Sequence, residues 1–223
     1  MYETIREYVP FYSKLNEKQR FRLENGSQAL TFAKGRRVHT ANECSGLVFV
    51  VKGQLRCTSI NEEGRDITLF RLFERDCCLF SAYCMLANLE FDVTVDAAED
   101  TEVILIPAGL ARELADENLV VTKFINVILQ QRLSDLMWLI DQILNKKIDS
   151  RLSALLVEEA RITGSTKLTL THDDAAKHLG SAREVISRAL GYLQKEGEVK
   201  LTRGSIEILD LDALEERAEA SLR

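Results

Sequence analysis

The most informative pattern in this chain of 223 residues is THDDAAKHLGSAREVISRALGYLQKEG, Thr171–Gly197. A first helix is predicted over about 172–179, where Gly180 ends it, and Gly197 ends a second helix that follows. Two short helices joined by a tight turn with a glycine are typical of a helix-turn-helix. The stretch therefore predicts this motif in the last third of the chain.

Both predicted helices begin with the spacing of a capping box, in which a hydroxyl group caps the first turn and a carboxylate follows three residues later. Thr171 and Asp174 have this spacing, and Ser181 and Glu184 repeat it. We therefore expect Thr171 and Ser181 to cap the two helices. The N-terminus of the second helix also attracts a phosphate group.

The sequence around the two helices predicts a wing. Val199–Thr202 and Ile206–Leu209 have the composition of two strands, and the turn Arg203-Gly204 joins them. A short β run, Lys167–Leu170, precedes the first helix. Residues 148–223 are therefore predicted to form a winged helix-turn-helix domain.

The second predicted helix has a polar side at its N-terminal end, where a recognition helix meets base edges in the major groove. Arginine matches the two acceptors of guanine, and glutamate accepts from cytosine N4. The opposite side is apolar and can pack inward: Val185, Ile186, Ala189, Leu190 and Leu193. The predicted DNA contacts are Arg183, Glu184, Ser187, Arg188, Thr171, Ser181 and Arg203.

Two observations stand against DNA binding. The polar side is also compatible with a solvated helix on which Glu184 and Arg188 form an ion pair. The net charge of −6 opposes attraction to phosphates, unless basic groups cluster on one face. Acidic residues gather in the final helix (Glu215, Glu216, Glu219), and basic residues gather in the helix pair and wing (Lys177, Arg183, Arg188, Lys195, Arg203).

Residues 30–107 consist of short β-rich runs separated by polar turns. Many short strands at regular spacing are typical of a sandwich or barrel. The predicted strands are Leu47–Val51, Leu55–Ile60, Ile67–Leu72, Phe91–Ala97 and Thr101–Ile106.

A long helix is predicted from about Asn118 to Lys146, where glycine and proline are absent. It carries two apolar stripes, which need two surfaces to cover them. We expect the helix to pack one stripe against its own β domain and the other against a partner helix. The alternative is that the two stripes form one broad apolar surface that is buried within a single subunit. The predicted homodimer interface is the stripe with coiled-coil spacing that Arg132 interrupts: Ile125, Leu129, Leu136, Leu139 and Ile143. The second stripe is Leu133, Met137, Ile140 and Leu144.

The stretch Ser181–Leu190, with Glu196-Gly197 and Arg203–Ile206 after it, resembles the signature of the Crp/Fnr regulators. The resemblance continues in the N-terminal half, where Pro10-Phe11, Gly35, Gly53 and Asn61–Arg65 fall at the opening motif and β-roll turns of that family.

The resemblance implies an α+β fold in three parts. It implies a cyclic-nucleotide-binding-like β-roll, or jelly roll, over 1–117, a dimerisation helix and hinge over 118–147, and the winged helix-turn-helix over 148–223. It further implies a dimeric transcription regulator that binds a near-palindromic site in double-stranded DNA and contacts RNA polymerase. In this family Arg183, Glu184 and Arg188 are expected to read bases.

The sensor stretch departs from the cyclic-nucleotide binders of the family. Leu79-Phe80 stands where those proteins have a Gly-Glu pair, and Phe91-Asp92 stands at their Arg-Ser or Arg-Thr pair. We therefore expect no response to cyclic AMP. Arg75 is the nearest substitute for the lost arginine, and we expect it to face solvent at a turn.

Cysteines cluster in the same stretch. Thiolates bind haem, Fe–S clusters or zinc and respond to oxidants, whereas free cysteines are also common as small buried apolar residues. The sequence is compatible with three kinds of sensor in the β-roll, which are haem, an Fe–S cluster and a site for a small-molecule effector. The candidate effector pocket is Phe80, Phe91, Asp92, Cys77, Cys78 and Cys84.

Two other function classes compete with a regulator. A ligand-binding or scaffold protein could use the winged helix to contact protein. An enzyme of the cupin type would need clustered metal ligands, but His39, His172 and His178 are dispersed along the chain, so we predict no catalysis and no metal site. The sequence starts without a signal peptide and has no membrane-length apolar run, which predicts a cytoplasmic protein.

Overall fold

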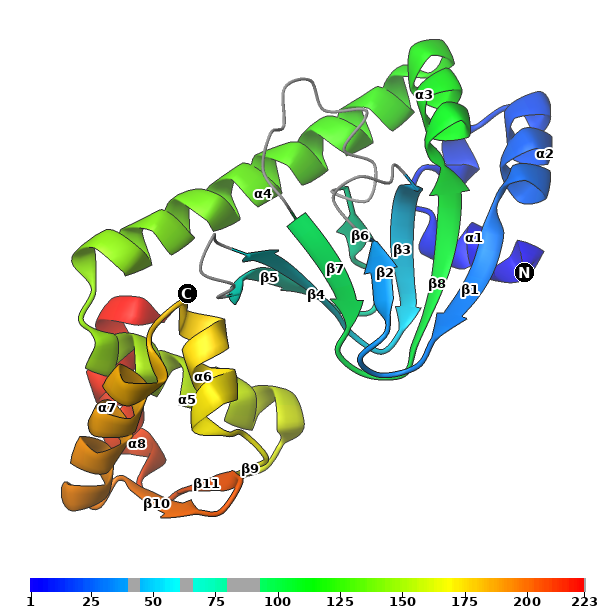
Figure 1. The fold of residues 1–223 in the computed structure, drawn as a ribbon. Coiled ribbons are helices and arrows are strands. Elements are labelled where there is room, and N and C mark those ends of the chain that lie inside the picture. Colours follow the sequence, from blue (N-terminus) through cyan, green and yellow to red (C-terminus); the bar gives the residue numbers. More distant parts are fainter. Residues whose placement is uncertain (40–44, 61–65, 80–92, 223) are drawn as a thin grey trace. The chain divides into compact units, whose positions relative to one another are not determined.

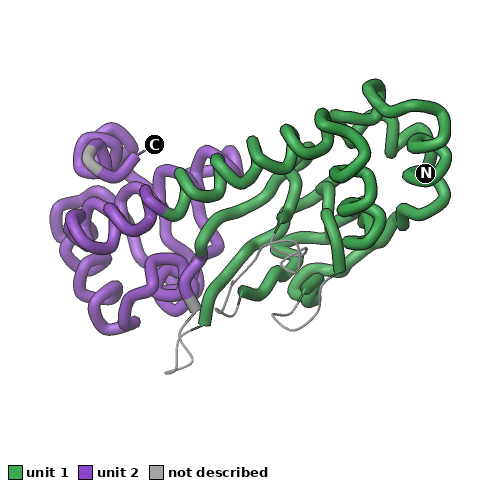
Figure 2. The backbone as a smooth tube through the Cα atoms, turned by 90° about the horizontal axis from the view of Figure 1, so that it is seen from above, with its two compact units in different colours: residues 1–60, 69–136 green, residues 61–68, 137–223 purple. Residues whose placement is uncertain are grey.

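A computed structural model describes residues 1–39, 45–60, 66–79 and 93–222 of the chain (Figure 1). Its contacts divide the chain into two units (Figure 2). The first unit comprises Met1–Ile60 and Leu69–Leu136, and the second comprises Asn61–Thr68 and Met137–Arg223. Among the described helices, none is both long and apolar enough to cross a membrane.

Two four-stranded sheets make up the centre of the first unit. One has the strand order β1-β8-β3-β6, with β1 (Gln28–Phe32), β8 (Thr101–Pro107), β3 (Gly46–Lys52) and β6 (Cys77–Cys78). The other has the order β2-β7-β4-β5, with β2 (Arg37–His39), β7 (Val93–Ala97), β4 (Leu55–Ile60) and β5 (Asp66–Leu72). The strand pairs are antiparallel, as in a sandwich or roll.

Strand β3 explains why the first sheet is buried on both faces. Successive side chains of a strand point to opposite faces. Leu47 and Phe49 pack into a core beneath the helices, and Val48 and Val50 pack into a second core between the sheets. A continuous apolar run in β3 therefore serves two layers at once.

Three helices that the sequence did not predict cover the first sheet. They are α1 (Tyr2–Tyr8), α2 (Glu17–Gly26) and α3 (Ala108–Glu117), and a 3-10 turn, Tyr12–Lys14, lies between the first two. Each contributes buried side chains to the core beneath the helices, among them Ile5, Leu23 and Leu114.

The turn between β3 and β4 requires a glycine. Gly53 has a φ of 87°, which lies in the left-handed region. A Cβ atom added there would lie 2.5 Å from the carbonyl oxygen of Asp100 and 2.7 Å from the hydroxyl of Thr101. The turn therefore packs closely against the neighbouring connection between β7 and β8.

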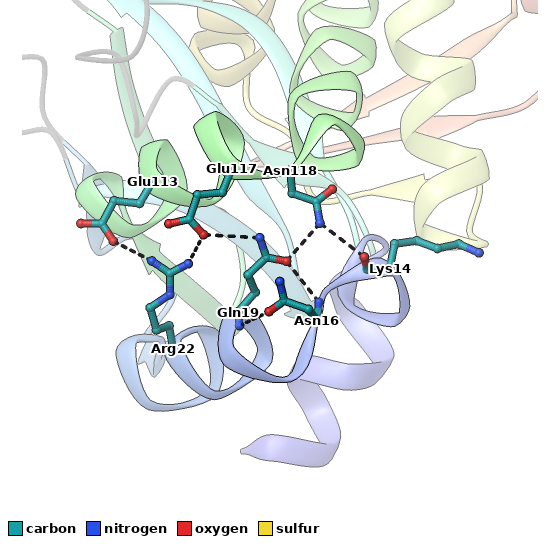
Figure 3. A network of polar contacts seen from close by, with 7 residues as sticks. All are labelled: Lys14, Asn16, Gln19, Arg22, Glu113, Glu117 and Asn118. Carbon is teal, nitrogen blue, oxygen red and sulfur yellow. Dashed lines mark hydrogen bonds and ion pairs between the residues drawn. The ribbon is translucent and has the colours of Figure 1, made fainter.

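Helix α4 (Leu119–Asn145) begins at a polar junction that α2 supports (Figure 3). The side-chain amide of Asn118 donates to Oε1 of Gln19 at 3.1 Å and to the carbonyl of Lys14 at 3.3 Å. Gln19, which is buried, also completes the capping box of α2 with Asn16 and donates to Glu117 at 3.4 Å. One glutamine thus joins the start of α2 to the junction of α3 and α4.

The two apolar stripes of α4 have different surroundings. Ile125 and Leu129 pack against the core beneath the helices, and Leu136 packs against the core between the sheets. These three residues of the predicted dimer interface therefore contact their own unit in part, whereas Ile143 of the same set is 46 % exposed, so the interface stays a prediction. The residues of the second stripe are exposed: Leu133 (62 %), Met137 (57 %), Ile140 (47 %) and Leu144 (74 %).

The second unit consists of helices around one apolar core and a small sheet. Its helices are α5 (Ile148–Thr163), α6 (His172–Leu179), α7 (Arg183–Lys195) and α8 (Leu211–Ala218), followed by a 3-10 turn, Glu219–Ser221. Its sheet has the order β10-β11-β9, with β10 (Val199–Thr202), β11 (Ser205–Ile208) and β9 (Lys167–Leu168). The helices and the hairpin follow the order that the sequence predicts.

Candidate nucleic-acid interface

Helix α6 begins with the predicted capping box. The hydroxyl of Thr171 accepts from the backbone N–H of Asp174 at 3.1 Å, and the carboxylate of Asp174 accepts from the backbone N–H of Thr171 at 3.1 Å. Gly180 ends the helix in the left-handed conformation with a φ of 59°. The first helix of the motif and the turn that follows it are therefore confirmed.

Helix α7 begins one residue later than its capping pattern predicts. Its N-cap is Ala182, which has no side chain to cap the helix, and the carbonyl of Ala182 accepts from the N–H groups of Val185 and Ile186. Ser181 therefore precedes the cap, and the second predicted capping box is wrong. Glu184 remains in the first turn, where the helix dipole favours a negative charge.

The two sides of α7 have the predicted burial. Ile186, Ala189, Leu190 and Leu193 are buried, and Val185 is partly buried. Arg183, Glu184 and Arg188 are exposed, and Ser187 is partly buried. The apolar side holds α7 in the core of the second unit, which leaves the polar side available to a partner.

Polar contacts join α7 to the first turn of α6. Nη1 of Arg183 lies 3.2 Å from Oδ2 of Asp173, and the hydroxyl of Ser187 lies 2.9 Å from Nδ1 of His172. Neither contact can be predicted from the sequence, since a capping pattern does not show what its inner residues touch. Nε of Arg188 donates to the main-chain carbonyl of Glu184 at 3.4 Å, so these two side chains do not form the ion pair considered above.

The wing is a β-hairpin that lies next to α7 along the chain. β10 pairs with β11 from Val199↔Ile208 to Thr202↔Ser205, and β11 also pairs with β9. Arg203 is exposed at the turn, and Gly204 has a φ of 77°. The hairpin thus presents an arginine at its tip.

Charge is distributed unevenly in the second unit. Lys177, Arg183, Arg188, Lys195 and Arg203 are exposed. Glu215 pairs with Arg161 at 2.8 Å and Glu198 pairs with Arg217, while among the exposed basic residues Arg183 pairs with Asp173. The acidic net charge of the chain therefore does not determine the charge around α7 and the wing.

Comparisons with known proteins agree with this geometry. Residues 150–217 match the family described as the Crp-like helix-turn-helix domain. A solved structure of a Crp/Fnr-family protein from Eubacterium rectale ATCC 33656 is 42 % identical in sequence, with a TM-score of 0.93, over 96 % of this chain and 99 % of that one. The chain belongs to the Crp/Fnr family.

Two curated relatives come from Thermus thermophilus. The transcriptional regulator SdrP is 29 % identical over 77 % of this chain and 83 % of its own length. The protein named cyclic AMP receptor protein is 26 % identical over 77 % of this chain and 79 % of its own length. The chain is thus a DNA-binding transcriptional regulator of the Crp/Fnr type, a family that is not enzymatic, and its first unit contains the β-roll of that family.

The sensor region of this Crp/Fnr protein is described only in part. Phe80, Cys84, Phe91 and Asp92 lie outside the described residues, so the candidate effector pocket stays a prediction. Within the described residues, no three histidine, cysteine or acidic side chains come together in a way that could hold a metal ion.

The two described cysteines of the predicted pocket are buried on opposite faces of β6. Cys77 belongs to the core beneath the helices, and Cys78 belongs to the core between the sheets, where Cys57 also lies. Burial raises the pKa of Cys77 and of Cys57 well above the usual value of a thiol. Two adjacent thiols that point to opposite faces of a strand cannot both contact the same ligand.

Arg75 lies at a turn, as the sequence predicts. Its side chain is 60 % exposed and pairs with Glu7 at 2.9 Å, while the guanidinium lies 5.0 Å from the ring centroid of Tyr8. Its φ of 74° is in the left-handed region. These contacts hold Arg75 against α1.

Proposed function

We propose that α7 is the recognition helix of this regulator and reads bases in the major groove through Arg183, Glu184, Ser187 and Arg188. The observation that carries this proposal is the division of α7 into a buried apolar side and an exposed polar side within a capped, winged motif. The proposed phosphate contacts are Thr171, Ser181 and Arg203, which lie at the starts of the two helices and at the wing tip.

We also propose that the protein acts as a homodimer through the exposed apolar side chains of α4, which are the second stripe and Ile143 of the interface predicted from the sequence. Crp/Fnr regulators bind DNA and act as dimers. Leu133, Met137, Ile140 and Leu144 recur at spacings of four, three and four, which is the repeat of a coiled-coil seam. Solvent-exposed apolar groups in such a row favour association, because their burial removes them from water.

A two-fold dimer implies a near-palindromic site whose half-sites lie about 34 Å apart, which is one turn of DNA. The proposed division of the chain is a sensing β-roll over 1–117, a dimerisation helix over 118–147 and a DNA-binding domain over 148–223. RNA polymerase is the proposed protein partner. The proposed signal is a ligand other than a cyclic nucleotide.

The test begins with DNA of random sequence. Binding measured by fluorescence anisotropy should be strong at about 50 mM salt and much weaker at about 200 mM, since phosphate contacts release counterions. A selected site should then be bound more tightly than random DNA. A protein scaffold would show neither the salt dependence nor a selected sequence.

Arg188→Ala separates base reading from phosphate binding. It should weaken binding to the selected site by about 1–3 kcal/mol and leave binding to random DNA almost unchanged. Arg161→Ala is a matched control, because Arg161 lies on α5 and pairs with Glu215. If Arg188→Ala weakened binding to the selected site and to random DNA equally, Arg188 would contact a phosphate and not a base.

A further inference from the structure

The first turn of α6 contacts two of the residues that we propose to read bases. The carboxylate of Asp173 lies 3.2 Å from the guanidinium of Arg183, and Nδ1 of His172 lies 2.9 Å from the hydroxyl of Ser187. His172 and Asp173 are adjacent in the chain, so one turn of helix reaches two positions of α7. Neither residue belongs to the set proposed above to touch DNA.

The pair of Asp173 and Arg183 contributes little to the stability of the fold. Their side chains are 55 % and 62 % exposed, and ion pairs at exposed positions have small net free energies. The larger effect of this pair is on the orientation of the Arg183 guanidinium. A guanidinium has five N–H donors in a fixed plane, so a carboxylate on one edge orients the rest toward the two acceptors of a guanine.

The contact between His172 and Ser187 controls what the serine can offer to a base. A hydroxyl has one proton and two acceptor sites. When Nδ1 accepts that proton, Ser187 can only accept from a base, and when Nδ1 donates, Ser187 keeps its proton for a base acceptor. The imidazole of His172 therefore determines whether Ser187 acts toward a base as a hydrogen-bond acceptor only or also as a donor.

We infer that His172 and Asp173 are positioning residues, which set the base preference of the regulator through Ser187 and Arg183 without touching bases. The inference rests on the proposed function, because it needs α7 to read DNA. It extends the specificity-determining set from one helix to two. The competing role is a structural clip that merely holds α6 against α7.

The experiment is selection of binding sites by the full-length protein from a randomised DNA duplex pool, with thermal unfolding measured for each variant. Asp173→Asn should relax the preference at one half-site position by about tenfold, at the position that Arg183→Ala also relaxes. In the Arg183→Ala background, Asp173→Asn should have no further effect on preference, since its action passes through Arg183.

Glu215→Gln is the matched control for charge. It also removes an exposed carboxylate from an ion pair in the second unit, but on α8. Both substitutions should raise affinity for random DNA through weaker repulsion of phosphates. Only Asp173→Asn should change the selected sequence.

His172→Ala should relax the position that Ser187→Ala relaxes, again by about tenfold. His172→Asn should restore part of that preference, because its side-chain amide places a polar atom near the position of Nδ1. A structural clip would lower the melting temperature without moving the selected sequence.

The outcomes separate the two proposals. If the wild-type protein selects no sequence, the proposed function is wrong and the inference falls with it. If the wild type and Arg183→Ala behave as proposed but Asp173→Asn and His172→Ala keep the wild-type preference, only the inference is overturned. A gain in affinity from Asp173→Asn that is larger for the selected site than for random DNA would also overturn it, since Asp173 would then compete with the base.

Discussion

The guanidinium of Arg217 on α8 donates to the carboxylate of Glu198, with Nε 3.1 Å from Oε2. Glu198 has an 8 % exposed side chain, and the guanidinium also lies 5.3 Å from the ring centroid of Tyr192. The hydrogen bond with Glu198 raises the pKa of Arg217, so its charge persists at any working pH. This pair joins α8 to the turn between α7 and β10.

Arg217→Ala should lower the free energy of unfolding of the second unit by about 2–3 kcal/mol, because it leaves a buried carboxylate without its cation. Urea unfolding measures this loss. Arg161→Ala is the control and should cost about 0–1 kcal/mol, since its pair with Glu215 is exposed. Adding Glu198→Gln to Arg217→Ala should restore stability, and equal losses for Arg217→Ala and Arg161→Ala would contradict the prediction.

The capping box of α6 should depend on pH. Burial alone would raise the pKa of Asp174, but the hydrogen bonds from the hydroxyl and backbone N–H of Thr171 and the nearby charge of Lys177 lower it below its ordinary 3.8. A lowered folded pKa means that the carboxylate stabilises the fold above pH 3.8 and that this contribution disappears as the pH falls through the folded pKa.

Asp174→Asn should therefore destabilise the protein at pH 7 by about 0.5–1 kcal/mol, the low end for a cap that is partly exposed. The difference from wild type should shrink below about pH 4. Urea unfolding at pH values from 7 to about 3 measures it. Asp212→Asn, in the first turn of α8 but outside a capping box, is the control. A difference that stays constant with pH would refute the assignment.

The exposed stripe of α4 predicts a specific pair of variants. Leu133→Asp with Ile140→Asp should give monomers with much weaker affinity for DNA, because two charges would then oppose burial of the stripe. Sedimentation measures the oligomeric state. Gln131→Asp with Asn145→Asp adds the same charge on exposed positions of α4 that lie outside the stripe, and it should leave the dimer intact. An unchanged dimer in the first pair would place the interface elsewhere.

The buried cysteines should be inert in the folded protein. Raised pKa values keep Cys57 and Cys77 protonated, and thiolate is the reactive form. Peptide mapping after treatment with iodoacetamide at pH 7.5 should show both unmodified, and both should react in urea. Fast modification of the folded protein would reopen a redox role for this part of the β-roll.

Cyclic AMP should not bind this protein tightly. Removing water from a charged phosphate costs several kcal/mol unless an arginine compensates, and Arg75 is engaged with Glu7 and Tyr8. Calorimetric titration should show no dissociation constant for cyclic AMP below about 1 mM. If cyclic AMP bound with a micromolar dissociation constant and Arg75→Ala abolished this binding, Arg75 would contact the ligand instead of Glu7 and Tyr8.

The sequence predicts the second unit well because local patterns determine it. The apolar spacing of Ile186 and Leu190 sets the buried side of α7, and Thr171 with Asp174 sets the start of α6. The start of α7 is misplaced because Ser181 has the chemistry of a cap, while the helix begins after Ala182. A capping pattern fixes a helix end only to within a residue.

Long-range packing explains what the sequence could not predict. Both stripes of α4 are apolar, so periodicity alone could not show that Leu136 packs on the β-roll while Leu133 remains exposed. The contact of His172 with Ser187 joins residues fifteen positions apart. Such contacts depend on the angle between two helices, which a linear pattern does not contain.

The ion pair between Asp173 and Arg183 makes two positions depend on each other during evolution. A duplicated copy of this regulator that replaces Arg183, in order to recognise another operator, keeps a carboxylate beside the recognition helix without its cation. That carboxylate repels DNA phosphates, so the intermediate binds every sequence more weakly until Asp173 also changes. New operator preferences in this lineage should therefore arise through paired substitutions, and relatives that read different half-sites should differ at both positions together.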